Sequence, residues 1–153
     1  MNTLVVHFSK FGHTERLALE IAAALGPPVT VISAEEFSSE ALEGKDLLII
    51  GTPTHKMNLP EVVKPVLDRL PKGAMRGKQF AAFDTSYELS RPLQPFTAAK
   101  RLDRKLRKLG GTRILAPETF IVEGREGPLR DGEQQRAQKW AATIALTTQL
   151  AVS

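Results

Sequence analysis

Residues 3–25 read TLVVHFSKFGHTERLALEIAAAL: a short apolar run, a polar loop with a single glycine, and a segment with helical spacing. Leu17, Ile21 and Leu25 recur every four positions, which is the spacing of one buried helix face. The following Gly26-Pro27-Pro28 ends that helix, because glycine and proline rarely continue one. The stretch therefore predicts a strand, a loop and a helix, which is the first half of a βαβ unit.

Strand-like and helix-like segments keep alternating to the end of the chain. The run Leu47-Leu48-Ile49-Ile50-Gly51 is its most apolar stretch, as is typical of a central strand covered on both faces. We expect further strands at 29–32 and 79–83, a last strand at 112–122 interrupted at Pro117, and helices at 35–43, 60–69, 97–109 and 133–150. This alternation predicts a three-layer, doubly wound α/β fold with five parallel strands, in one domain spanning residues 1–153.

The composition excludes several kinds of chemistry. The 153 residues contain no cysteine, so disulfides, thiolate metal sites and cysteine nucleophiles are excluded. Only three histidines are present, and we expect no bound metal. No apolar run approaches the roughly 20 residues of a membrane span, and the first residues do not resemble a signal peptide. We therefore expect a cytoplasmic protein that does not associate with membranes.

The chain is basic, with a formal net charge of +4, and much of the excess lies at residues 100–108. Leu102, Leu106 and Leu109 give this segment one apolar helix face, so its lysines and arginines lie on the opposite, solvent-exposed face. A surface helix is the interpretation that this spacing favours. Nucleic-acid binding is the alternative, although the segment lacks the interleaved aromatic side chains that stack on bases.

In doubly wound sheets, ligands bind beyond the carboxyl ends of the strands, where the strand order reverses. The loop after the first strand contains Ser9, Lys10, Phe11, Gly12, His13 and Thr14. Gly12 permits a tight turn, and the helix that follows offers unpaired amides and a partial positive charge. These features favour a phosphate site, although an ordinary capped turn would have the same appearance. The spacing fits neither a P-loop nor a dinucleotide fingerprint.

Two further loops follow strands that should end at the same edge. The second begins at Gly51 and contains Thr52, Pro53, Thr54, His55 and Lys56. It is long for a strand-to-helix connection, and long loops at such positions often carry function. The third contains Asp84, Thr85, Ser86 and Tyr87, the only tyrosine of the chain. A tyrosine ring at this edge is able to stack on a flat ligand, or simply to cover a helix end.

Together the three loops resemble those of flavodoxins, over essentially the whole chain. Residues 9–14 resemble the motif Thr/Ser-x-Thr-Gly-x-Thr that follows the first flavodoxin strand, with Phe11 in place of one hydroxyl residue. Residues 51–54 are similar to the second flavodoxin loop, and residues 84–87 occupy the position of the third. The resemblance implies a flavodoxin-like fold with strand order 2-1-3-4-5 and FMN as the cofactor.

The same resemblance implies a role for each loop. Residues 9–14 would wrap the FMN phosphate, chiefly through backbone amides. Residues 52–56 would border one side of the isoalloxazine ring. Residues 84–87 would border its other side and its pyrimidine edge, and no residue is assigned a catalytic role of its own.

The implied function is that of a flavoprotein acting in redox chemistry. It would transfer electrons to a redox partner protein, or reduce a quinone-like small molecule as an FMN-dependent oxidoreductase. A flavodoxin-fold interaction protein that has lost the cofactor is the alternative, motivated by Phe11. The residues leave a monomer and a homodimer equally open.

Overall fold

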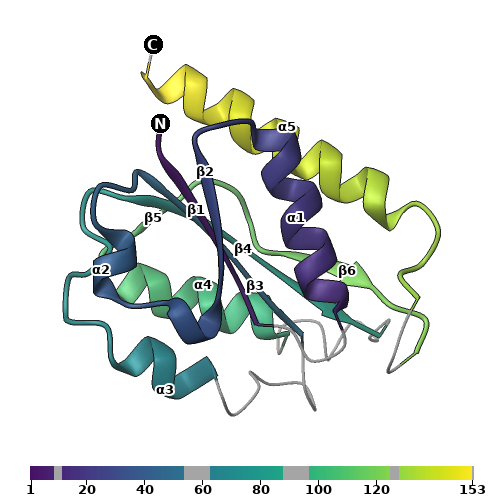
Figure 1. Ribbon diagram of the computed structural model, residues 1–153, viewed down its shortest axis with the longest axis horizontal. Helices are drawn as coiled ribbons and strands as arrows, with labels where there is room; N and C mark the ends of the chain where they lie inside the picture. The colour runs from purple at the N-terminus through teal and green to yellow at the C-terminus, as the bar shows by residue number, and fades with distance from the viewer. Residues whose placement is uncertain (9–11, 54–62, 88–96, 125–127, 153) are drawn as a thin grey trace.

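A computed structural model describes residues 1–8, 12–53, 63–87, 97–124 and 128–152 (Figure 1). In chain order its elements are β1 (Thr3–His7), α1 (His13–Leu25), β2 (Val29–Ser33), the 3₁₀ helix η1 (Ala34–Glu36), α2 (Ser39–Leu42), β3 (Leu47–Pro53), α3 (Val63–Asp68), β4 (Gln79–Ser86), α4 (Ala98–Lys108), β5 (Thr112–Arg113), β6 (Glu118–Ile121) and α5 (Glu133–Val152). Strands and helices alternate as the sequence predicts.

The strands form a parallel sheet in the order β2-β1-β3-β4-β5, with β6 also paired to β4. β1 lies between β2 and β3, so that Val5 is opposite Val31 on one side and Ile49 on the other. The fifth position is shared by β5 and β6, which pair with successive parts of β4. The predicted order and the predicted interruption around Pro117 are therefore confirmed.

Helices cover both faces of the sheet, which gives the three predicted layers (Figure 1). α1 and α5 cover one face, and α2, α3 and α4 cover the other. The side chains of β3 alternate between the layers, because successive residues of a strand point to opposite faces. Ile49 packs in the core under α1 and α5, whereas Leu48 and Ile50 pack in the core under α3 and α4.

An aromatic cluster fills the core under α5, close to the ends of β4 and β6. The ring of Phe83 makes edge-to-face contacts with Phe120 and Trp140, at centroid distances of 6.0 and 5.9 Å. The Phe83 ring lies directly over Gly51 of β3, and a Cβ atom added to Gly51 would lie 2.1 Å from this ring. Gly51 is therefore required by the close packing of the sheet core rather than by its backbone conformation.

Several predicted boundaries differ from the structure. The single helix expected at 35–43 is instead η1 followed by the one-turn helix α2, and Phe37 and Leu42 are both buried. Phe37 and Ser38 are the extended residues that separate them, and serine favours helix caps over helix interiors.

The strand expected to end at Phe83 continues to Ser86, because β6 pairs with residues 83–86. Asp84, Thr85 and Ser86 are therefore strand residues and not loop residues. In the same way, β3 continues through Thr52 to Pro53. The helix expected at 60–69 begins at Val63 within the described part of the chain, so Pro65 lies in its first turn, where proline is tolerated.

Candidate functional site

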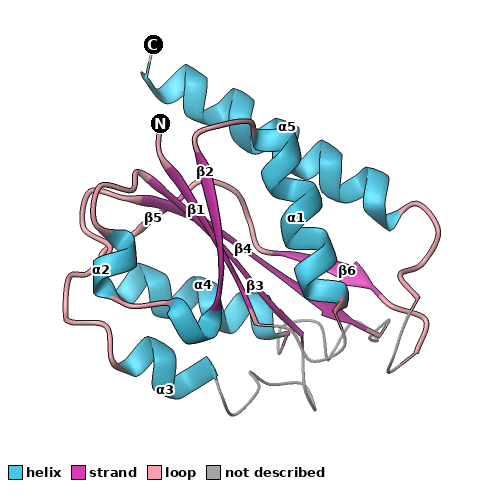
Figure 2. Cartoon of the chain, viewed as in Figure 1, coloured by secondary structure: helices cyan, strands magenta, loops and turns pink. Residues whose placement is uncertain are grey.

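The carboxyl ends of three strands and the start of α1 meet at one edge of the sheet (Figure 2). His7 is opposite Gly51, and the Phe8 N–H donates to the Gly51 carbonyl at 2.9 Å, which aligns β1 with β3. Thr52 is opposite Asp84 in the neighbouring strand pair. The switch point lies at this edge, since β1 connects to β2 on one side and β3 continues the sheet on the other.

α1 begins at this edge on a glycine in the left-handed conformation. Gly12 has a φ of 88° at the N-cap position, and no side chain caps the first turn within the described residues. A Cβ atom at Gly12 would meet nothing within 4 Å. Helix amides without a capping side chain favour an anion, so the start of α1 suits a phosphate group. Ser9, Lys10 and Phe11 of the predicted motif lie outside the described residues.

A hydrogen bond between two hydroxyls joins the first candidate segment to the third. The hydroxyls of Thr14 and Thr85 lie 3.1 Å apart, and both residues are buried. One turn of α1 is thereby held against the end of β4. Next to Thr14, the buried Nε2 atom of His13 has no hydrogen-bond partner within the described part of the chain. A polar ligand at the start of α1 would satisfy such an atom.

Asp84 holds a second helix at the same edge. Its side chain is fully buried, and its Oδ2 atom accepts the N–H of Ala99 in the first turn of α4 at 2.9 Å. A carboxylate at a helix N-terminus is stabilised by the helix dipole. Sequence reasoning missed this contact, because the spacing of the two residues carries no local signal. A role of Asp84 at the pyrimidine edge of a flavin stays a prediction.

The remaining candidates divide into residues at the edge and residues outside the described ranges. Thr52 and Ser86 are buried, and their hydroxyls donate to the carbonyls of Pro53 and Tyr87 at 3.2 and 2.9 Å. Tyr87 is 50% exposed, so its ring is accessible at the end of β4. Thr54, His55 and Lys56 lie outside the described residues.

An ion-pair cluster that sequence reasoning missed fixes the other flank of this edge. Glu133, in the first turn of α5, accepts the Ile121 N–H of β6 at 2.6 Å and pairs with Arg136 at 2.8 Å. Arg136 also pairs with Glu118, and its guanidinium lies 4.5 Å from the centre of the Phe120 ring. The only available signal was the Glu–Arg spacing of three residues at the start of a helix.

Burial alone would raise the pKa of Glu133. The hydrogen bonds from Arg136 and from the Ile121 amide, together with the positive charges of Arg136 and Arg130, outweigh burial and hold that pKa below its ordinary value. Glu133 therefore remains ionised at neutral pH and locks α5 to β6, the strand beside the end of β4.

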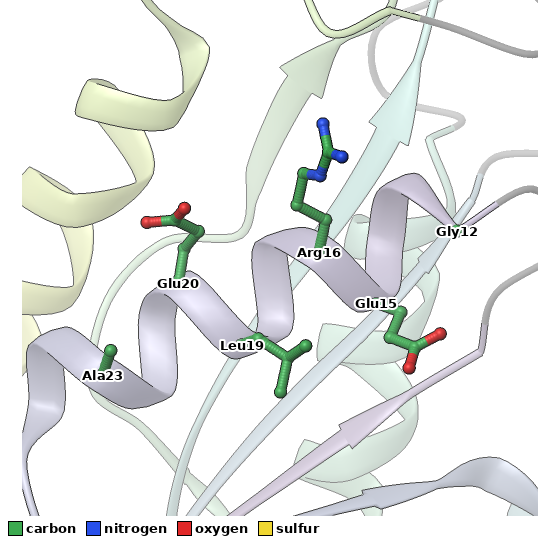
Figure 3. Close-up of a pocket in the computed structure, with 6 residues that line it drawn as sticks. All are labelled: Gly12, Glu15, Arg16, Leu19, Glu20 and Ala23. Atoms are coloured by element: carbon green, nitrogen blue, oxygen red, sulfur yellow. The ribbon is translucent and has the colours of Figure 1, made fainter.

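A shallow groove runs along the outer side of α1 (Figure 3). It has a volume of about 440 Å³ and is lined by Gly12, Glu15, Arg16, Leu19, Glu20 and Ala23. Within the described part of the chain, its lining residues come from one helix and its cap, and β3 and β4 contribute none. The groove therefore shares only Gly12 with the candidate residues described at the edge.

Within the described residues, no three histidine, aspartate or glutamate side chains are grouped so as to hold a metal ion. None of the described helices combines the length and apolarity that a membrane crossing requires.

These features define a class of protein: a doubly wound α/β protein in which a helix begins on a left-handed glycine at the switch point of the sheet. The family model described as flavodoxin matches residues 5–140, and the chain belongs to the flavodoxin family. Its cofactor is FMN, as in that family. The left-handed start of α1 fits the phosphate of that cofactor, as does the buried His13 nitrogen, which has no hydrogen-bond partner among the described residues. No curated protein sequence matches the chain.

Solved structures with low sequence identity share the fold. Flavodoxin 1 from Bacillus cereus is 20% identical with a TM-score of 0.76, over 95% of this chain and 98% of that one. A flavodoxin, WrbA-like protein from Agrobacterium tumefaciens is 22% identical with a TM-score of 0.73, over 97% and 98%. Rubredoxin oxygen:oxidoreductase from Desulfovibrio gigas is 19% identical with a TM-score of 0.77, over 99% of this chain but 37% of that one. The fold thus occurs both alone and within longer chains.

Proposed function

We propose that this chain is an FMN-dependent electron-transfer protein of the cytoplasm. Flavodoxins bind FMN and transfer electrons to redox partners. The observation that carries the proposal is the left-handed start of α1 on Gly12, at the edge where β3 and β4 end. Gly12, His13 and Thr14 would hold the phosphate there, together with Ser9, Lys10 and Phe11.

The flavin ring would lie between the ends of β3 and β4. Thr52 and Pro53, with the following Thr54, His55 and Lys56, would border one side. Tyr87 would stack on the other side, because its ring is half exposed and its backbone is fixed by the Ser86 hydroxyl. Asp84 would act mainly by holding the start of α4, and Thr85 by holding the start of α1.

When bound, FMN supplies the redox chemistry, and the protein supplies binding, orientation and electrostatics. The role of this chain is therefore to fix the ring at the sheet edge while keeping part of it accessible to a partner. Two-electron reduction of a quinone-like molecule is the second version of this function that the sequence predicts, and it uses the same residues.

The experiment is an FMN titration of the purified protein, followed by flavin fluorescence and visible absorption. Gly12→Ala places a methyl group at the phosphate site and strains a left-handed position by about 1–2 kcal/mol. Gly44→Ala is the matched control, since Gly44 also has a positive φ and open space around its Cβ position, but precedes the opposite end of β3. We expect Gly12→Ala to weaken FMN binding at least tenfold and Gly44→Ala to leave it unchanged.

Equal FMN affinities of the two variants would contradict the phosphate assignment. A wild-type protein that binds no FMN even at saturation would instead support the interaction protein that the sequence left as the alternative. Anaerobic stopped-flow mixing of the reduced, FMN-loaded protein with a one-electron haem acceptor or with a quinone separates the two versions of the redox function.

A further inference from the structure

The charge of the chain is strongly segregated. Residues 63–78 and 98–113, which we call the basic face, contain twelve lysines and arginines but only two acidic residues. Their net charge of +10 compares with +4 for the whole chain, so the remaining residues carry −6. The modest net charge of the chain conceals this asymmetry.

The two segments lie on the same side of the sheet. Residues of α3 and α4 share one hydrophobic core, and the Met75 N–H donates to the Leu109 carbonyl at 3.0 Å. Lys105 of α4 forms an ion pair with Asp68 at the end of α3. That lysine, with Lys64, holds the pKa of Asp68 below its ordinary value, so the carboxylate stays charged.

Both acidic residues of the basic face are already engaged. Asp68 pairs with Lys105, and the buried Asp103 pairs with Arg107 at 3.0 Å and Arg113 at 3.4 Å. In contrast, the side chains of Lys100, Arg104 and Lys108 make no hydrogen bond or ion pair within the described residues. They follow one another at intervals of four, which places them in one row along α4.

This row of cations is unfavourable for the folded protein. Like charges four residues apart destabilise a helix by about 0.2–0.5 kcal/mol per pair. Lys100 and Arg101 also lie in the first turn of α4, where the helix dipole disfavours a positive charge. At Lys100 and Arg101, helix stability alone would favour acidic residues, whereas Lys108 lies in the last turn, where the dipole favours a cation. The positive charge of the basic face is therefore better explained by an external anionic partner.

We propose that the basic face is a docking surface for an acidic protein, the redox partner of the electron-transfer function proposed above, on which this inference rests. Its position suits that role, because the hydrogen bond from Ala99 to Asp84 ties the start of α4 to the candidate flavin edge. Complementary charge would steer the partner and accelerate encounter.

The composition of the face disfavours the other anionic macromolecules. None of the exposed large hydrophobic residues of the described chain belongs to it, so it offers no side chain for bilayer insertion or base stacking. It also contains no asparagine, glutamine or tyrosine, so any contact with base edges would be limited mainly to its arginines and lysines. What it presents is a dense array of cations suited to surface carboxylates.

The test measures binding of the full-length protein to poly-L-glutamate as the carboxylate probe, over a series of salt concentrations. Arg104→Glu reverses one charge of the basic face, and Lys139→Glu is the matched control on α5, with the same change in net charge. We expect Arg104→Glu to weaken binding about three- to tenfold at low salt and Lys139→Glu to have no effect. We also expect Lys100→Glu to weaken binding while raising the melting temperature, since it relieves repulsion within α4.

Equal weakening by Arg104→Glu and Lys139→Glu would overturn the proposal, because net charge would then account for the binding. Tighter binding to duplex DNA or to phosphatidylglycerol vesicles at the same ionic strength would overturn it in favour of those ligands. The measurement needs no flavin. A wild-type protein without FMN affinity would therefore remove the electron-transfer function while leaving the docking result interpretable.

Discussion

The contact between Gly51 and the Phe83 ring yields a prediction in which a single methyl group is decisive. In Gly51→Ala, the new Cβ atom would lie 2.1–2.4 Å from three atoms at the far end of that ring. The ring has little room to withdraw, because Phe120 and Trp140 pack against it. The backbone at Gly51 does not have a positive φ, so steric overlap is the main source of the cost.

Overpacking a close-packed core costs about 1–3 kcal/mol, and the confined ring places Gly51→Ala at the upper end. The lower conformational entropy of the unfolded alanine chain offsets about 0.4–1 kcal/mol. We therefore expect the free energy of unfolding to fall by about 2 kcal/mol. For a chain of this length, the melting temperature would fall by about 4–8 °C.

Urea unfolding followed by circular dichroism measures this loss, and a double-mutant cycle with Phe83→Leu identifies its cause. Leucine lacks the outer ring atoms that the new Cβ atom meets. The double variant should therefore be more stable than the sum of the single effects predicts, by about 1 kcal/mol or more. A wild-type stability for Gly51→Ala, or strictly additive effects, would refute the steric explanation.

Two further predictions concern the polar contacts at the candidate edge. Thr14→Val and Thr85→Val should each lower the free energy of unfolding by about 1–3 kcal/mol, since each leaves one buried hydroxyl without its partner. Urea unfolding of the double variant tests the coupling of the two hydroxyls: a loss of stability equal to the sum of the two single losses would contradict it. Because the pKa of Glu133 is lower in the folded protein than its ordinary value of 4.5, its stabilisation is present above that pH and disappears as the pH falls through the folded pKa. The stability difference between wild type and Glu133→Gln should therefore shrink as the pH falls below 4.5, and a constant difference would exclude Glu133 as its source.

Much of the fold could be predicted from periodicity, whereas the ends of the central strands could not. Leu47 to Ile50 and the leucines of α4 are apolar because they are buried. Their spacing can be read directly from a single sequence. Pro53 and Asp84 belong to residue types that are depleted in strands. They are extended because neighbouring strands supply hydrogen-bond partners, and local sequence does not contain that information.

The candidate site was predictable as a set of segments but not as a set of contacts. Gly12 was selected by its place between a strand and a helix, and the structure gives it the left-handed conformation that such a turn requires. The pairing of Thr14 with Thr85 joins residues 71 positions apart, so only the assembled sheet brings them together. The ligand contacts of these residues stay predictions.

The end of β4 connects the two helical layers to the candidate site. Successive strand residues point to opposite faces of the sheet, and residues 83–85 follow this alternation. Phe83 and Thr85 face the layer of α1 and α5, where Thr85 holds the first turn of α1. Asp84 faces the other layer and holds the first turn of α4.

A shift of β4 by one residue would exchange these faces and release both helix starts at once. The pairing of residues 83–86 with β6 opposes such a shift, and the Glu133–Arg136 cluster in turn fixes β6 to α5. The short strand β6, which contributes no candidate residue of its own, therefore sets the register on which their geometry depends.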